Sequence, residues 1–206
     1  MRSLTRERES LLKEKTIIAN KIHAQQTAFQ IAKSTLRRSK QRINLLQKQI
    51  LCIDSELKTL ISSSEMLTSK VHEITKVIGL SLLTVATVIA ETNGFGIIRN
   101  QKQLVGYAGL DVIIKQSGQK SSIGRLSKKG NGHIRKALFM PAMSSSRSND
   151  LMKIIYQQLN QRQAAKKQGL MVVAKKLLLL IYALWKNNTE YDPKKNIQSR
   201  LVLTTV

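Results

Sequence analysis

The chain has 206 residues, enough for one or two domains, and carries 35 Lys and Arg against 12 Asp and Glu, a formal net charge of +23. This excess indicates a polyanionic partner, with nucleic acid as the leading candidate. Hydrophobic residues make up 42% of the chain, which excludes a disordered basic tail, and the single cysteine, Cys52, excludes a disulfide framework and a Cys-built zinc site.

Residues 1–76 are predicted to form a coiled-coil helical hairpin. Neither Gly nor Pro occurs before Gly79, and the apolar residues keep a heptad register along two seams. One seam comprises Leu4, Leu11, Ile18, Ala32, Leu46, Ile53, Leu60, Leu67 and Ile74, and the other comprises Ile22, Phe29, Leu36, Ile43, Ile50, Leu57 and Val71. Such a stripe also predicts homo-oligomerisation through the coiled coil.

Two breaks are predicted within this helical segment. The polar residues Gln25 and Ser39 lie on the first seam and bracket a bend that would fold the stripe into an antiparallel hairpin. Ser62 and Glu65 have the spacing of a capping box, which predicts a new helix. The alternative is one continuous helix roughly 110 Å long, at about 1.5 Å per residue.

Residues 77–190 are predicted to form a compact helical domain, and residues 191–206 a tail. A buried helix is expected over 82–91, and Asn100 is placed to cap a short helix that ends at Gly106. A polar connection is expected over 144–150 and a basic loop over 161–169. The apolar run that follows, 170–185, contains Lys175 and Lys176 and is too short to span a membrane, so it predicts a buried core helix.

The middle of this domain combines glycine with positive charge. Between Val112 and Asn149 there are eight Lys and Arg and no Asp or Glu, and eight of the ten glycines lie between Gly94 and Gly132. A close-approaching basic loop suits contact with phosphate groups rather than with base edges, although a solvated basic loop is the alternative. The candidate DNA- or RNA-binding residues are Lys115, Lys120, Arg125, Lys128, Lys129, Arg135 and Lys136.

Lys128 and Lys129 stand before Gly130 and a predicted helix from His133, an arrangement typical of an anion site at a helix N-terminus. His133 itself has no carboxylate nearby in sequence. It is therefore expected to act as a helix cap or a phosphate contact rather than as a base.

The chemistry that the loop can support is limited by its lack of acids. Nucleases that use two metal ions need three or four carboxylates, and beyond residue 76 the chain has only Glu91, Asp111, Asp150, Glu190 and Asp192. No metal ligand is therefore predicted in this chain. A serine nucleophile remains open: Ser117 precedes Gly118, with Lys115, Lys120 and Arg125 available to stabilise charge on an attacked phosphate. A locally hydrogen-bonded loop serine is the alternative, and the rival candidates are Ser121, Ser122 and Ser127.

Over roughly residues 65 to 186 the chain resembles transposases of the insertion-sequence 116/110/902 group, specifically their C-terminal domain. The blocks that carry the resemblance are 79–91, 104–110, 116–118, 126–131 and 134–142. At a turn that in this family commonly has Gly at two alternating positions, the second position here is Ser81.

The resemblance implies a site-specific DNA recombinase in which the serine of the Ser-Gly block attacks DNA and forms a transient phosphoserine link. That serine is Ser117, which places it above its rivals. It also implies a preceding acidic RNase-H-like domain that binds Mg²⁺, an element-encoded guide RNA and an oligomeric assembly. The chain lacks that domain, so it looks like a truncated or split transposase, and no cofactor is expected within it.

These expectations combine into an all-α protein, a coiled-coil hairpin followed by a helical transposase domain with a basic Gly-rich loop. The expected function is DNA transposition, with strand cleavage and transfer through Ser117. The alternative is a non-catalytic fragment that binds DNA or RNA and dimerises, and a purely structural scaffold ranks last. A bacterial, cytoplasmic protein without membrane association is expected.

Overall fold

The computed structural model describes residues 1–27, 32–113, 116–117, 120–121, 125–162 and 166–193. The chain divides into two compact units, Met1–Ser64 and Glu65–Val206. The boundary lies earlier than the predicted residue 76, because helix α3 (Glu65–Thr75) packs against α4 (Leu82–Glu91) and α8 (Lys166–Asn187) of the second unit. Helices dominate both units, which confirms the all-α fold class.

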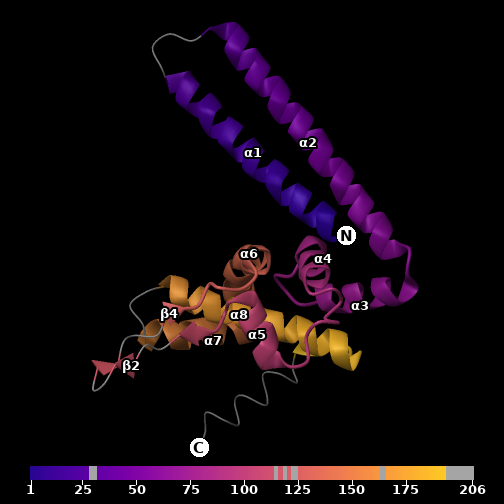
Figure 1. Cartoon of the computed structure of the whole chain (residues 1–206), viewed down its shortest axis with the longest axis vertical. Helices are drawn as coiled ribbons and strands as arrows, with labels where there is room; N and C mark the ends of the chain where they lie inside the picture. The colour runs from indigo at the N-terminus through magenta and orange to yellow at the C-terminus, as the bar shows by residue number, and fades with distance from the viewer. Residues whose placement is uncertain (28–31, 114–115, 118–119, 122–124, 163–165, 194–206) are drawn as a thin grey trace, which may run out of the picture. The chain divides into compact units, whose positions relative to one another are not determined.

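The first unit is the predicted antiparallel hairpin of α1 (Arg2–Thr27) and α2 (Lys33–Ser62), which run side by side in Figure 1. Two contacts across the pair fix its direction. Arg8 binds Asp54 with Nε and Oδ1 2.5 Å apart, and Lys15 donates a hydrogen bond to the side chain of Gln47. Because higher residue numbers in α1 lie opposite lower ones in α2, the two helices are antiparallel.

The heptad seam is buried on α2, with one shift near its end. The buried apolar residues of this helix are Leu46, Ile50, Ile53, Leu57 and Ile61. Leu60, predicted on the seam, is 41% exposed, and Ile61 takes its place at 3%. An α-helix turns every 3.6 residues rather than 3.5, so a strict seven-residue repeat drifts away from a straight interface. The predicted second break is also present, since α2 ends at Ser62 and α3 begins at Glu65.

The second unit is organised around α8. This helix packs against α3, α5 (Gln101–Ala108), α6 (Gly132–Ser148) and α7 (Asp150–Arg162). It begins at Lys166, within the predicted basic loop, and its completely buried residues are Val173, Ala174, Leu177, Leu178 and Ile181. By length and composition α8 could cross a membrane, but half of its most apolar stretch is buried inside the unit, as in a core helix.

Polar caps set the ends of the short helices. The Ser81 hydroxyl accepts a hydrogen bond from the Thr84 amide at the start of α4, so the serine at the turn position serves as an N-cap. Asn100 caps α5 as predicted, accepting from the Gln103 amide at 2.8 Å. The helix does not end at Gly106. It continues to Ala108 and ends at Gly109, whose φ of 64° is left-handed.

The predicted connection over 144–150 is largely helical, because α6 continues to Ser148. Ser145 is completely buried, and its hydroxyl donates to the Ile78 carbonyl oxygen at 2.8 Å. A Cβ at Gly79 would lie 2.0 Å from the Ser145 Oγ. The small side chains at these positions therefore let α6 pack closely on the turn before α4, and the serines signal close packing rather than a loop.

Candidate nucleic-acid interface

The glycine-rich segment forms two nested pairs of antiparallel strands, which we call the β arm (residues 111–127). The outer pair joins β1 (Val112–Ile113) to β4 (Arg125–Leu126), and the inner pair joins β2 (Gln116–Ser117) to β3 (Lys120–Ser121). The segment expected as a loop is thus a β-hairpin, inserted between two helices of the second unit.

The base of the β arm is closed by backbone hydrogen bonds between its two sides. The Ser127 amide donates to the Asp111 carbonyl oxygen at 2.9 Å, and the Lys128 amide donates to that of Gly109 at 3.2 Å. The Asn131 amide then donates to the Tyr107 carbonyl oxygen at 2.6 Å. These bonds continue the antiparallel pairing from the strands to the ends of α5 and α6.

Arg135, on the first turns of α6, binds both sides of this base. Its Nη1 donates to the carbonyl oxygens of Ala108 at 2.8 Å and Gly130 at 3.0 Å, and its Nη2 donates to that of Lys128 at 3.0 Å. The fixed fork of the guanidinium suits this role, because one planar group serves three acceptors. Arg135 was predicted to contact nucleic acid, but its described contacts are to the protein backbone.

Two glycines allow this close approach. A Cβ at Gly130 would lie 2.2 Å from the Tyr107 carbonyl oxygen and 2.4 Å from the Gly109 amide nitrogen, both of them backbone atoms. Gly109 has a left-handed φ, and a Cβ added to it would lie 2.5 Å from the Arg135 Nη1. The base of the β arm therefore depends on residues without side chains at these two positions.

Asn131 joins the β arm base to the core. Its Oδ1 caps α6, accepting from the amides of His133 at 2.9 Å and Ile134 at 3.3 Å. Its Nδ2 donates to Oε2 of Glu91 at 2.7 Å, and that carboxylate is completely buried. The helix cap is Asn131 and not His133. Because Asn131 occupies these two amides, the predicted anion site would depend on lysine side chains more than on free amides of the helix.

The two lysines of the predicted anion site lie exposed beside this base. Lys128 and Lys129 follow the last strand, and Lys128 has a φ of 54°, a left-handed backbone that non-glycine residues rarely adopt. The Lys129 amide donates to the hydroxyl of Ser127, a half-buried residue that was one of the rival nucleophiles. Lys136 is exposed on α6.

The remaining predicted residues lie on or beside the strands. Ser117 is paired with Lys120 in the inner ladder, and Arg125 with Ile113 in the outer one. Lys115 and the rival Ser122 lie outside the described residues, and Ser121 is paired with Gln116. The backbone register thus brings Ser117 and Lys120 opposite each other.

Metal binding finds little support in the part of the chain that the structure describes. The Asp111 Oδ1 at the base of the β arm is buried without a hydrogen-bond partner. Within the described ranges no group of three His, Cys, Asp or Glu residues could hold a metal ion.

Two features, one in each unit, were not predicted from the sequence. Glu91 and Asn131 together connect α4 to the β arm base, and no periodicity or spacing in the sequence signals their contact across forty positions. The second feature is a run of basic residues in the first unit, 15–53, which contains no Asp or Glu. A scan for charge runs along the hairpin would have found it.

Comparison with known proteins finds a match to a family model within the second unit. Residues 71–157 match the model of the family described as "Transposase IS116/IS110/IS902 family". The matched residues include the whole β arm with its base, from α5 to the start of α6, as well as most of α7.

Two curated relatives align over a longer stretch. Both are named "Pilin gene-inverting protein", one from Moraxella bovis and one from Moraxella lacunata, and each is 28% identical over 148 residues. The alignment covers 69% of this chain and 45% of each relative. The chain thus spans less than half the length of the curated relatives that it matches.

Proposed function

We propose that the chain takes part in DNA transposition or site-specific recombination, because residues 71–157 match the model of the transposase IS116/IS110/IS902 family. The names of the two relatives, which describe inversion of a gene, support a rearrangement of DNA. The net charge of +23 supports a nucleic-acid substrate.

Ser117 is the nucleophile in this proposal. Its Oγ gives up its proton and attacks a phosphodiester. An Oγ–P bond forms, one P–O bond to a sugar breaks, and the proton ends on the released sugar oxygen, which becomes a free hydroxyl. A second strand end then attacks the phosphoserine with its own hydroxyl, which restores the serine and completes strand transfer. The energy of the phosphodiester is conserved in the link, so no external co-reactant is needed.

The observation that supports this proposal most is the hydrogen bonding that holds the β arm and its base. Ser117 lies on a paired strand opposite Lys120, and the base of the arm is held by three hydrogen bonds from Arg135. A nucleophile must be held near its attack geometry, and a framed hairpin restricts the backbone that carries it. Exposed Lys128 and Lys129 are available for phosphates next to the reacting one.

A guide RNA and a homo-oligomer belong to the same proposal. The heptad seam is used within the chain, between α1 and α2, so a further copy would need another surface.

A covalent adduct is the test of the chemistry. The full chain is mixed with a nicked suicide DNA substrate, alone and with an RNase-H-like domain of the family added in trans. We expect a protein–DNA adduct that the Ser117→Ala variant does not form and that Ser127→Ala still forms. An adduct that survives Ser117→Ala would refute the assignment. Binding without any adduct in either mixture would instead favour the non-catalytic DNA- or RNA-binding function.

A further inference from the structure

The excess of positive over negative charge in the first unit comes from one part of its sequence. Residues 15–53 contain eight Lys and Arg and no Asp or Glu, whereas residues 1–14 and 54–64 together contain five basic and five acidic residues. The whole formal excess of the unit therefore falls within 15–53.

Folding into a hairpin places most of this basic run at one end of the α1–α2 pair. The contact between Lys15 and Gln47 marks a level on both helices. All acidic residues of the first unit lie on the side of that level away from the connection between α1 and α2: Glu7, Glu9, Glu14, Asp54 and Glu56. We call residues 15–27 and 33–47, on the other side, the basic hairpin end.

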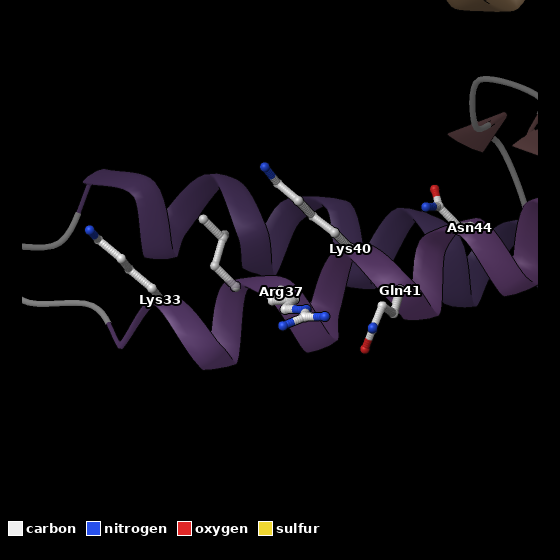
Figure 2. Close-up of a pocket in the computed structure, with 6 residues that line it drawn as sticks. Lys33, Arg37, Lys40, Gln41 and Asn44 are labelled. Atoms are coloured by element: carbon white, nitrogen blue, oxygen red, sulfur yellow. The ribbon is translucent and has the colours of Figure 1, made fainter.

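An open pocket of about 350 Å³ lies on α2 within the basic hairpin end. Positions 33, 37, 40 and 44 are spaced by four, three and four residues, so they share one face of the helix over roughly 16 Å. Figure 2 shows Lys33 and Lys40 extending in the same direction from the helix. The pocket is lined by Lys33, Leu36, Arg37, Lys40, Gln41 and Asn44, and no carboxylate is among them.

We propose that the basic hairpin end binds the sugar-phosphate backbone of duplex nucleic acid. Three exposed cations and two side-chain amides on one helical face supply donors at intervals that a row of phosphates can accept. The lining carries no aromatic ring on which unpaired bases could stack, which favours a duplex over a single strand. A membrane surface fits less well, because it requires a broad apolar face beside the basic one, and the seam of α2 is buried against α1.

This surface adds a contact in a different unit from the β arm, and it does not depend on the chemistry of Ser117. Two variants of the full chain with the same change in charge test it. Lys33→Glu/Arg37→Glu alters the pocket, whereas Lys13→Glu/Lys58→Glu alters exposed residues near the acidic end of the same hairpin. Binding to labelled DNA and RNA duplexes is measured by fluorescence anisotropy over a salt series, with circular dichroism as a check on helix content.

We expect the pocket variant to bind at least tenfold more weakly, with a salt dependence less steep by about 2 in log–log slope, since two phosphate contacts are lost. The control variant should bind within about twofold of the parent. The tighter of the two duplexes identifies the nucleic acid that the surface accepts. Equal binding by both variants would overturn the proposal. Parental binding by the pocket variant together with weakened binding by a Lys128→Glu/Lys129→Glu variant would overturn it while leaving the proposed function intact.

Crosslinking locates the contact directly. Exposed Cys52 is first replaced by serine, and a photoreactive group is attached at Gln41→Cys or, as a control, at Lys58→Cys. We expect the duplex to crosslink at position 41 and not at 58. Equal labelling at both positions would contradict the proposal. So would displacement of the duplex from position 41 by phosphatidylglycerol vesicles or polyglutamate at equal charge, since any polyanion would then suffice.

Discussion

Asn131 donates a hydrogen bond to the buried carboxylate of Glu91 at 2.7 Å while its own carbonyl oxygen caps α6. One side chain thus caps the start of a helix and hydrogen-bonds a buried carboxyl group at the same time. Glu91 ends α4, so the contact ties this helix to the residues that return from the β arm.

The Asn131→Ala variant should lower the free energy of unfolding by about 2–4 kcal/mol, since it removes a helix cap and a partner of a buried carboxylate. Asn131→Ser restores a capping oxygen but not the donor to Glu91, so its loss should be smaller. Asn100→Ala, at the exposed cap of α5, provides the reference for a cap alone, about 1 kcal/mol. Urea denaturation measures all three. A loss for Asn131→Ala no larger than for Asn100→Ala would mean that the bond to Glu91 adds no stability.

The Arg135→Met variant should loosen the base of the β arm, because three backbone carbonyls lose a charged donor. We expect hydrogen exchange of the Ser127, Lys128 and Asn131 amides to become about tenfold faster. Arg147→Met makes the same substitution at an exposed position on the same helix and should leave these rates unchanged. Unchanged exchange in Arg135→Met would show that the backbone bonds alone hold the base.

Two glycines of this region should respond to alanine in opposite ways. Gly130→Ala places a Cβ against backbone atoms and should destabilise the protein by about 1–3 kcal/mol. Gly106 lies inside α5, where an added Cβ would have open space around it, so Gly106→Ala should stabilise the protein by up to about 1 kcal/mol through helix propensity. Thermal unfolding of the two variants checks the sign. Similar behaviour of both would contradict the close approach at Gly130.

The Lys128→Glu/Lys129→Glu variant should weaken binding to every duplex by a similar factor, because phosphate contacts carry no sequence information. The salt dependence should again become less steep by about 2. Anisotropy with several unrelated duplexes measures both quantities. Loss restricted to one sequence would indicate contact with base edges instead.

The helices were predictable where a single local sequence pattern determines their position or their end. The heptad stripe, the break between Ser62 and Glu65, the cap Asn100 and the buried run before Trp185 each point to a feature that the structure contains. The capping box itself is not formed, because Ser62 is the last residue of α2 and Glu65 is the first of α3. The misplaced ends at Gly106 and over 144–150 have different causes. The serines are read as breakers, but Ser145 packs closely against the turn at Gly79 inside a continuing helix. At Gly106 an added Cβ would have open space, and α5 continues to Gly109, which adopts the left-handed φ that ends the helix.

The amino-acid composition of the candidate site could be read from the sequence, but its three-dimensional arrangement could not. The absence of acids between Val112 and Asn149 predicts that the β arm contacts phosphates, and the structure shows the arm to be a hairpin of very short strands. Two-residue strands carry too little periodicity to be recognised. The role of Arg135 was equally hidden, since its three acceptors are backbone carbonyls, which every sequence has.

The separation of charge along the hairpin also gives the first unit a large electric dipole. In the field of a polyanion such a dipole experiences a torque that turns the connection between α1 and α2 toward the anion before contact. Encounters then begin in one orientation, and the rate at which they occur falls as added ions shorten the range of the field.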